Sequence, residues 1–265
     1  MSRQTGLIRL DGKIGGISFY RANGEDLAKI ANGPSKERIL ADPNFIRTRE
    51  NNTEFGGSAT AGKSLRLSLA TAILTMGDAR LVSRMTKLFK SINVKGTGAR
   101  GQRAIALSAN RTMLENFEFN QKTHFSSVFN AAYSFTNNTQ RTQGTVTVPS
   151  FLPGSYIQAP AGATHFRLIS AIGVVSDYIY NSSTKHYEPA EPNLNTLGNV
   201  VYGTVAALDT TTPVTFSLVA ALGGTPVMTA TVSVVQCLGI EFFQHVGAND
   251  YLLAQNNCMK VINVF

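Results

Sequence analysis

The spacing of apolar residues changes near residue 120, and this change limits the possible folds more than any other feature of the sequence. Apolar side chains recur at helical spacing in 65–76 and again in 81–92. In 145–148 and 214–218, by contrast, apolar and polar residues alternate. The first pattern is typical of a helix that buries one face, and the second of a half-buried strand. The sequence therefore predicts an α+β protein in which helices come first and strands follow.

The first thirty residues predict a small β-meander. Two dipeptides that tolerate the positive φ angles of tight turns, Asp11-Gly12 and Asn23-Gly24, separate its short segments. The segments are 6–10, 13–21 and 25–31. We therefore expect two successive hairpins, and Gly33-Pro34 is expected to end the unit.

Start and stop signals divide the next stretch into three predicted helices. Asp42-Pro43 combines a carboxylate cap with a proline in the first turn of a helix. Gly56-Gly57 is expected to break this helix, and Ser58 to begin a second one that runs to about residue 76. Gly77 and Asp78 then separate the second helix from a third, which runs to about residue 92.

The residues after 120 predict an antiparallel β-sandwich that resembles a jelly roll, built from about eight or nine short strands. The runs 214–222 and 227–235 are joined by Gly223-Gly224-Thr225-Pro226, which predicts a hairpin. We expect a basic β-meander and helical region at 1–120, followed by an antiparallel β-sandwich domain at 121–265.

Charged residues are distributed unevenly along the chain, and the distribution changes near the same position as the apolar spacing. Residues 1–122 carry 20 lysines and arginines and 10 acidic residues, which gives a net charge of +10. Residues 123–265 carry 4 and 6, which gives −2. The two regions are therefore expected to meet different partners or surroundings.

The main candidate site is a basic surface on the third predicted helix and the loop after it. Arg80, Arg84 and Lys87 lie at i, i+4 and i+7, opposite the apolar stripe of 81–92. The candidate contact residues are Arg80, Arg84, Lys87, Lys90, Lys95, Arg100 and Arg103. Such a surface could neutralise the phosphates of a nucleic acid. A solvated helix face, or cations that pair with acids of a neighbouring subunit, would give the same pattern.

Residues 57–64, GSATAGKS, match the nucleotide-binding pattern GxxxxGK(S/T). A true phosphate-binding loop follows a buried parallel strand, and residues 47–55 are too charged to form one. We therefore interpret the match as fortuitous, with Ser58 capping a helix and Lys63 on the helix surface.

No residues with the spacing of a catalytic or metal site stand out in the sequence. The four histidines show no HExxH or other close ligand spacing; they are His124, His165, His186 and His245. Cys237 and Cys258 could form one disulfide, but two buried thiols are favoured. The sequence thus predicts a protein that is not an enzyme, with no cofactor, no catalytic residue and no metal ligand.

Four phrases of the sequence stand out together: GKIGGISFYR at 12–21, DPNFIRTRENNTEFG at 42–56, PAGATHFRLISA at 160–171 and GIEFFQ at 239–244. Together they resemble an uncharacterised family of bacterial proteins from Bacteroidota-type genomes that has no assigned activity. The resemblance therefore implies no site residue. It supports treating the whole chain as one unit.

The leading functional hypothesis is a structural subunit that self-assembles into a filament, a shell or a phage-like particle. Opposite charges on the two regions would let one copy dock head-to-tail on the next. The alternative is a nucleic-acid-binding protein that uses the basic helix and loop at 80–111.

No apolar run reaches the roughly 18 residues that a membrane span needs. No apolar signal core stands at the N-terminus, so we expect cytoplasmic synthesis and, in a particle or filament, later release.

Overall fold

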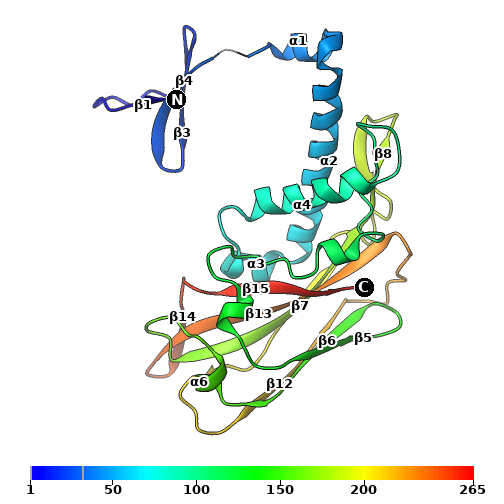
Figure 1. Cartoon of the computed structure of the whole chain (residues 1–265). Helices are drawn as coiled ribbons and strands as arrows, with labels where there is room; N and C mark the ends of the chain where they lie inside the picture. Colours follow the sequence, from blue (N-terminus) through cyan, green and yellow to red (C-terminus); the bar gives the residue numbers. More distant parts are fainter. Residues whose placement is uncertain (1, 32) are drawn as a thin grey trace. The chain divides into compact units, whose positions relative to one another are not determined.

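The computed structural model describes residues 2–31 and 33–265 and has a mixed α+β fold (Figure 1). Antiparallel sheets predominate, and one of them is curled into a half-barrel. The chain divides into two compact units, residues 1–49 and 50–265. The change of pattern near residue 120, where we expected a domain boundary, lies inside the second unit.

The N-terminal unit contains a four-stranded antiparallel meander in the order β1-β4-β3-β2. Its strands are β1 (Ser2–Arg3), β2 (Gly12–Ile14), β3 (Ile17–Ala22) and β4 (Glu25–Ile30). Asn23 and Gly24 both have positive φ, at 54° and 82°, which confirms the turn expected there. The other turn lies at Gly15-Gly16 rather than at Asp11-Gly12, because two adjacent glycines meet the demands of a tight turn at little steric cost.

Helices α1 (Lys36–Ala41), η1 (Pro43–Phe45), α2 (Ile46–Ser68), α3 (Ala70–Met76) and α4 (Leu81–Lys95) follow. The side chain of Asp42 accepts a hydrogen bond from the backbone of Asn44, so Asp42 caps η1, the turn that leads into α2. The break expected at Gly56-Gly57 is absent, and α2 runs through both glycines. Two glycines cost a helix about 2 kcal/mol in propensity, which tertiary packing can outweigh.

Gly57 has a packing role on α2. A Cβ atom at this position would lie 2.3 Å from the ring of Tyr187, whereas a Cβ at Gly56 would have no atom within 4 Å. Tyr187 belongs to the hairpin of β8 (Tyr178–Asn181) and β9 (His186–Pro189). The glycine therefore lets this hairpin approach the helix closely.

Strands β7 (His165–Ser176) and β13 (Val232–Val246) form the centre of the largest sheet. Their pairing extends from Ser176 opposite Val232 to His165 opposite Phe243. Neighbouring residues of β7 face different hydrophobic clusters, as Leu168 and Ile169 do. Both faces of this sheet are therefore buried, which explains why its strands are runs of apolar residues rather than alternating ones.

Each face of the central sheet has its own cover (Figure 1). Leu65 of α2 and Phe89 of α4 share a cluster with Ile169 of the sheet. On the other face, strands β6 (Gln143–Phe151) and β12 (Val214–Ala221) contribute to a second cluster that contains Leu168 and Leu238. Helices therefore cover one face, and a three-stranded sheet of order β12-β6-β5 covers the other.

The hairpin predicted between 214–222 and 227–235 is wrong. Strand β12 pairs with β6, and β13 pairs with β7, so the two runs belong to different sheets. The turn residues Gly223–Pro226 do not determine the partner of either strand, because cross-strand packing makes that choice. The remaining elements are η2 (Arg111–Met113), α5 (Phe125–Val128), β5 (Ser134–Asn137), α6 (Pro153–Tyr156), β10 (Gly198–Tyr202), β11 (Ala206–Ala207), β14 (Asn249–Leu252) and β15 (Cys258–Val264).

Cys237 and Cys258 are both free and buried, which confirms the sequence-based expectation. Burial raises the pKa of each thiol far above its ordinary range, so both thiols stay protonated and inert.

Among the described residues, no helix combines the length and the apolar character that a membrane crossing requires.

Adjacent glycines of α2 allow a matched test of this packing. Gly57→Ala is expected to lower the free energy of unfolding by about 1–3 kcal/mol, because its Cβ collides with the Tyr187 ring. Gly56→Ala, the control, is expected to raise that free energy by about 0.5–1 kcal/mol through helix propensity. Urea denaturation measures both, and equal stabilisation by the two alanines would contradict the described packing.

Candidate functional site

The structure separates the seven predicted cations into two groups. Arg84, Lys90, Arg100 and Arg103 form ion pairs with acids of the same chain. Arg80, Lys87 and Lys95 are exposed, and within residues 2–31 and 33–265 no ion pair joins them to an acid. The predicted surface is therefore only partly free to meet a ligand.

The carboxylate of Glu54 is the centre of the paired group. Glu54 lies on α2, and only 1% of its surface is exposed. Its Oε1 accepts hydrogen bonds from the backbone N–H of Gly101 at 2.8 Å and from Nε of Arg103 at 2.8 Å. Its Oε2 accepts from Nη2 of Arg103 at 2.7 Å and from Nζ of Lys90. One buried carboxylate thus joins α2, α4 and the loop after α4.

These donors also determine the protonation of Glu54. Burial alone would raise the pKa of this carboxyl, but hydrogen bonds from Arg103, Lys90 and Gly101 outweigh burial and lower it to about 2. The hydrogen bond to Glu54 raises the pKa of Arg103. Because the carboxylate stays ionised at neutral pH, both of its cationic partners are held in the interior network.

Arg84 is held at the other end of α4. Its Nη2 lies 2.9 Å from Oδ2 of Asp78 and donates a hydrogen bond to the backbone carbonyl oxygen of Phe119 at 2.9 Å, while its Nη1 donates one to the carbonyl oxygen of Glu118 at 2.6 Å. Its guanidinium also lies 5.2 Å from the ring centroid of Phe117. This arginine therefore fastens the 117–119 segment to α4 through contacts that occupy most of its donors.

Arg100 lies in the loop after α4 and pairs with Glu50 at 3.5 Å. Only Arg80, Lys87 and Lys95 then remain as a stripe on the exposed side of α4, with spacings of seven and eight residues. Neighbours in this stripe are about 10–12 Å apart along the helix axis. The described geometry therefore gives most of the predicted basic surface a role inside the fold.

The match to the nucleotide-binding pattern lies entirely inside α2. Its backbone N–H groups are engaged in the helix, so they are not available to surround a phosphate. The Ser58 hydroxyl donates to the carbonyl oxygen of Glu54 at 2.7 Å, and Lys63 is exposed on the helix. Residues 57–64 therefore do not form a phosphate-binding loop, as expected from the sequence. The expected role of Ser58 as a helix cap is wrong, because Ser58 lies in the interior of α2.

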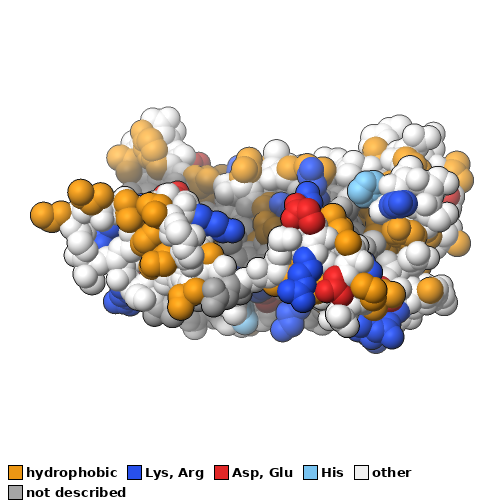
Figure 2. Space-filling view, turned by 90° about the horizontal axis from the view of Figure 1, so that it is seen from above, with side chains coloured by type: hydrophobic (Ala, Val, Ile, Leu, Met, Phe, Trp, Pro, Cys, Tyr) orange, Lys and Arg blue, Asp and Glu red, His pale blue; other side chains and the backbone are white. Residues whose placement is uncertain are grey.

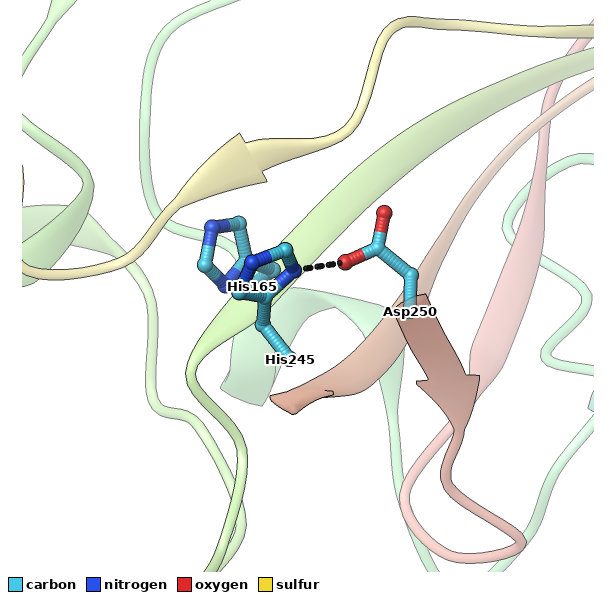
Figure 3. A group of neighbouring side chains, drawn as sticks. All are labelled: His165, His245 and Asp250. Carbon is cyan, nitrogen blue, oxygen red and sulfur yellow. Dashed lines mark hydrogen bonds and ion pairs between the residues drawn. The ribbon is translucent and has the colours of Figure 1, made fainter. Parts of the chain in front are cut away.

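Three side chains that no sequence pattern singled out meet at one end of the central sheet (Figure 3). His165 begins β7, His245 lies near the end of β13, and Asp250 lies on β14. The imidazole centroids are 4.8 Å apart, and Nδ1 of His245 lies 2.7 Å from Oδ1 of Asp250. Two imidazoles and a carboxylate are a donor set that can hold a metal ion.

Strand register explains why these three residues meet. Phe243 is opposite His165, and His245 is opposite Asp250. His165 and His245 are 80 positions apart in the chain, so ligand spacing could not reveal their proximity. The proximity of His245 and Asp250 does have a local signal, because Gly247-Ala248 is a two-residue connection between their strands.

Comparison with known proteins identified no relative. No family model matches the chain, and no curated protein or solved structure matches it.

Replacing Glu54 tests the network on the basic surface. Glu54→Gln is expected to lower the free energy of unfolding at pH 7 by about 3 kcal/mol, because it leaves two partly buried cations without their counter-charge. The folded-state pKa lies below the ordinary value of 4.5, so the carboxylate stabilises the protein above pH 4.5. This contribution is lost as the pH falls towards about 2.

Denaturation of wild type and variant across that pH range measures the effect, and the difference should shrink on acidification. Glu50→Gln, one turn earlier on α2, is the control, because its partner Arg100 is largely exposed. An unchanged stability of Glu54→Gln would contradict the structural role assigned to these cations.

Proposed function

We propose that the chain is a non-enzymatic structural subunit that assembles with copies of itself through its N-terminal meander. One observation carries the proposal: no described residue among 2–31 and 33–49 is buried, although four strands pair there. A sheet without a buried face lacks the main source of folding stability. Association with another surface would supply it.

One face of the meander is suited to such a contact. Ile14 is opposite Ile17, and Ile17 is opposite Ile30, so three isoleucines lie side by side across three strands. Their exposed fractions are 58%, 43% and 69%. Phe19 and Ala28, two positions further along, belong to the same face. These residues form the apolar face of the meander.

Leu7, Ile8 and Leu10, in the connection from β1 to β2, add further exposed apolar surface. Figure 2 shows hydrophobic side chains gathered on the meander, with lysine and arginine side chains beside them. Contiguous apolar surface on a small unit is typical of a protein interaction site. Burying it on a partner contributes about 25 cal/mol per Å² of apolar area.

Charge supports a second copy as the partner. Residues 1–49 carry nine lysines and arginines and five acids, a net charge of +4, while residues 123–265 carry −2. The meander of one copy is thus complementary in charge to the C-terminal region of another. A head-to-tail contact of this kind is heterologous, so it propagates into a ring or a filament, and into a shell where further contacts close it.

We propose also that the six-stranded sheet and the three-stranded sheet of order β12-β6-β5 are the two layers of a jelly-roll-like β-sandwich. The shared cluster between them supports this, because Val146 and Leu218 of the small sheet pack with Leu168 and Leu238 of the large one. The chain passes from one sheet to the other between β12 and β13, as chains do in sandwiches.

Charge substitutions on the apolar face test the assembly. The double variant Ile17→Glu, Ile30→Glu is expected to be a monomer of 28.5 kDa, whereas the wild type is expected to form multimers. The reason is that each interface would bury two unpaired carboxylates. Light scattering coupled to size exclusion measures the mass, after nuclease treatment and at low and moderate salt.

The double variant Leu67→Glu, Leu74→Glu is the control, because it adds the same charge at exposed apolar positions outside both the meander and residues 123–265. This control should assemble like the wild type. A wild type that is monomeric at high concentration would refute the proposal. Multimers that dissociate on nuclease treatment would support the nucleic-acid alternative, with Arg80, Lys87 and Lys95 as its exposed cations.

A further inference from the structure

We propose that His165, His245 and Asp250 bind one divalent transition-metal ion, with Zn²⁺ as the representative ion. The ion would join the start of β7 to the hairpin of β13 and β14 (Figure 3). The inference is independent of self-assembly, because all three residues belong to residues 50–265.

The backbone places the three side chains on one face of the sheet. His165 is opposite Phe243, His245 is two residues beyond Phe243, and Asp250 is opposite His245. Residues opposite each other, and residues two apart on one strand, project to the same side. The three side chains therefore share a face because of strand pairing, which does not depend on their rotamers.

This end of the sheet lacks the cover that the rest of the face has. Thr75 of α3 donates a hydrogen bond at 2.7 Å to Oε1 of Glu241, which is four residues before His245 on β13. Residues 244–252 beyond it are all exposed, so this tip of the hairpin has no buried apolar residue of its own. A metal ion would supply a link where side-chain packing does not.

The distances fit a metal ion after small side-chain rotations. The candidate donor atoms all lie within 4.8 Å of one another. A tetrahedral ion with bonds of about 2.0–2.1 Å keeps its donors roughly 3.3 Å apart. His245 and Asp250, whose donors are 2.7 Å apart, would then exchange their hydrogen bond for two bonds to the ion. Both side chains are partly exposed and free to make this adjustment.

The hydroxyl of Thr164 contacts both histidines of the site. Its Oγ1 accepts the backbone N–H of His245 at 2.8 Å and lies 3.0 Å from Nδ1 of His165. With Nδ1–H of His165 donating to this hydroxyl, Nε2 presents its lone pair to the ion. Metal-binding histidines usually donate their second ring N–H in this way, which fixes the ring.

The donor set indicates the class of ion. Two imidazole nitrogens and one carboxylate oxygen suit Zn²⁺ and neighbouring transition metals, whereas Ca²⁺ and Mg²⁺ prefer oxygen donors alone. Three protein ligands leave the fourth tetrahedral position to water. The main alternative is an ordinary hydrogen bond between His245 and Asp250, in which His165 has no part.

Calorimetric titration of the untagged, chelator-treated full chain with ZnCl₂ tests the inference. We expect one ion per chain, and an absorption band of tetrahedral character when Co²⁺ replaces Zn²⁺. His165→Ala, His245→Ala and Asp250→Asn are each expected to weaken binding by about tenfold or more, because each removes one ligand. His186→Ala is the matched control and should bind like the wild type, since His186 lies on the β8–β9 hairpin.

Several outcomes would overturn the inference: no binding of Zn²⁺ by the wild type, equal loss in His186→Ala, or unchanged affinity in His165→Ala. Circular dichroism of each variant identifies a loss caused by misfolding, and His165→Gln repeats the test with a side chain of similar size. The double variant Ile17→Glu, Ile30→Glu should bind Zn²⁺ normally, which separates failure of this site from failure of the proposed assembly.

Discussion

The pairing of β7 with β13 is the constraint on which the structure of residues 50–265 depends. Both strands are buried on both faces, so the sheet that they centre needs a cover on each side. Helices α2, α3 and α4 supply one cover, and the sheet of β5, β6 and β12 supplies the other. Helix α4 and strands β6 and β12 are amphipathic because each has only one side to bury.

The network around Glu54 shows that some of the basic residues of the N-terminal half have a structural role. A cluster of cations in a sequence indicates a ligand only where the cations are free, and here a buried carboxylate holds Lys90 and Arg103 against α2. An isolated buried carboxylate would be costly, so Glu54 and its two cationic partners form one unit. The positive charge of this region therefore contributes first to holding the helical cover together.

Two parts of the described chain have no buried residues, unlike the central sheet and the elements packed on it. The meander of β1–β4 exposes an apolar face, and the tip of the hairpin of β13 and β14, residues 244–252, is exposed. The two differ in chemistry, because isoleucines dominate the first and polar donor groups gather at the second. This difference is why a protein surface is proposed as the partner of the first and a metal ion as the partner of the second.

The sequence by itself determined the features that depend on neighbouring residues. It predicted the helical stripe of 81–92, the capping aspartate at 42, the Asn23-Gly24 turn and the alternating strands at 145–148 and 214–218, since propensity, capping and periodicity act over a few residues. Only the tertiary structure decided which strands pair, that α2 continues through Gly56-Gly57, and which cations form ion pairs. Glu54 is 49 residues from Arg103, and His165 is 80 from His245. Contacts over such separations are selected by the packing of whole elements, which no local pattern contains.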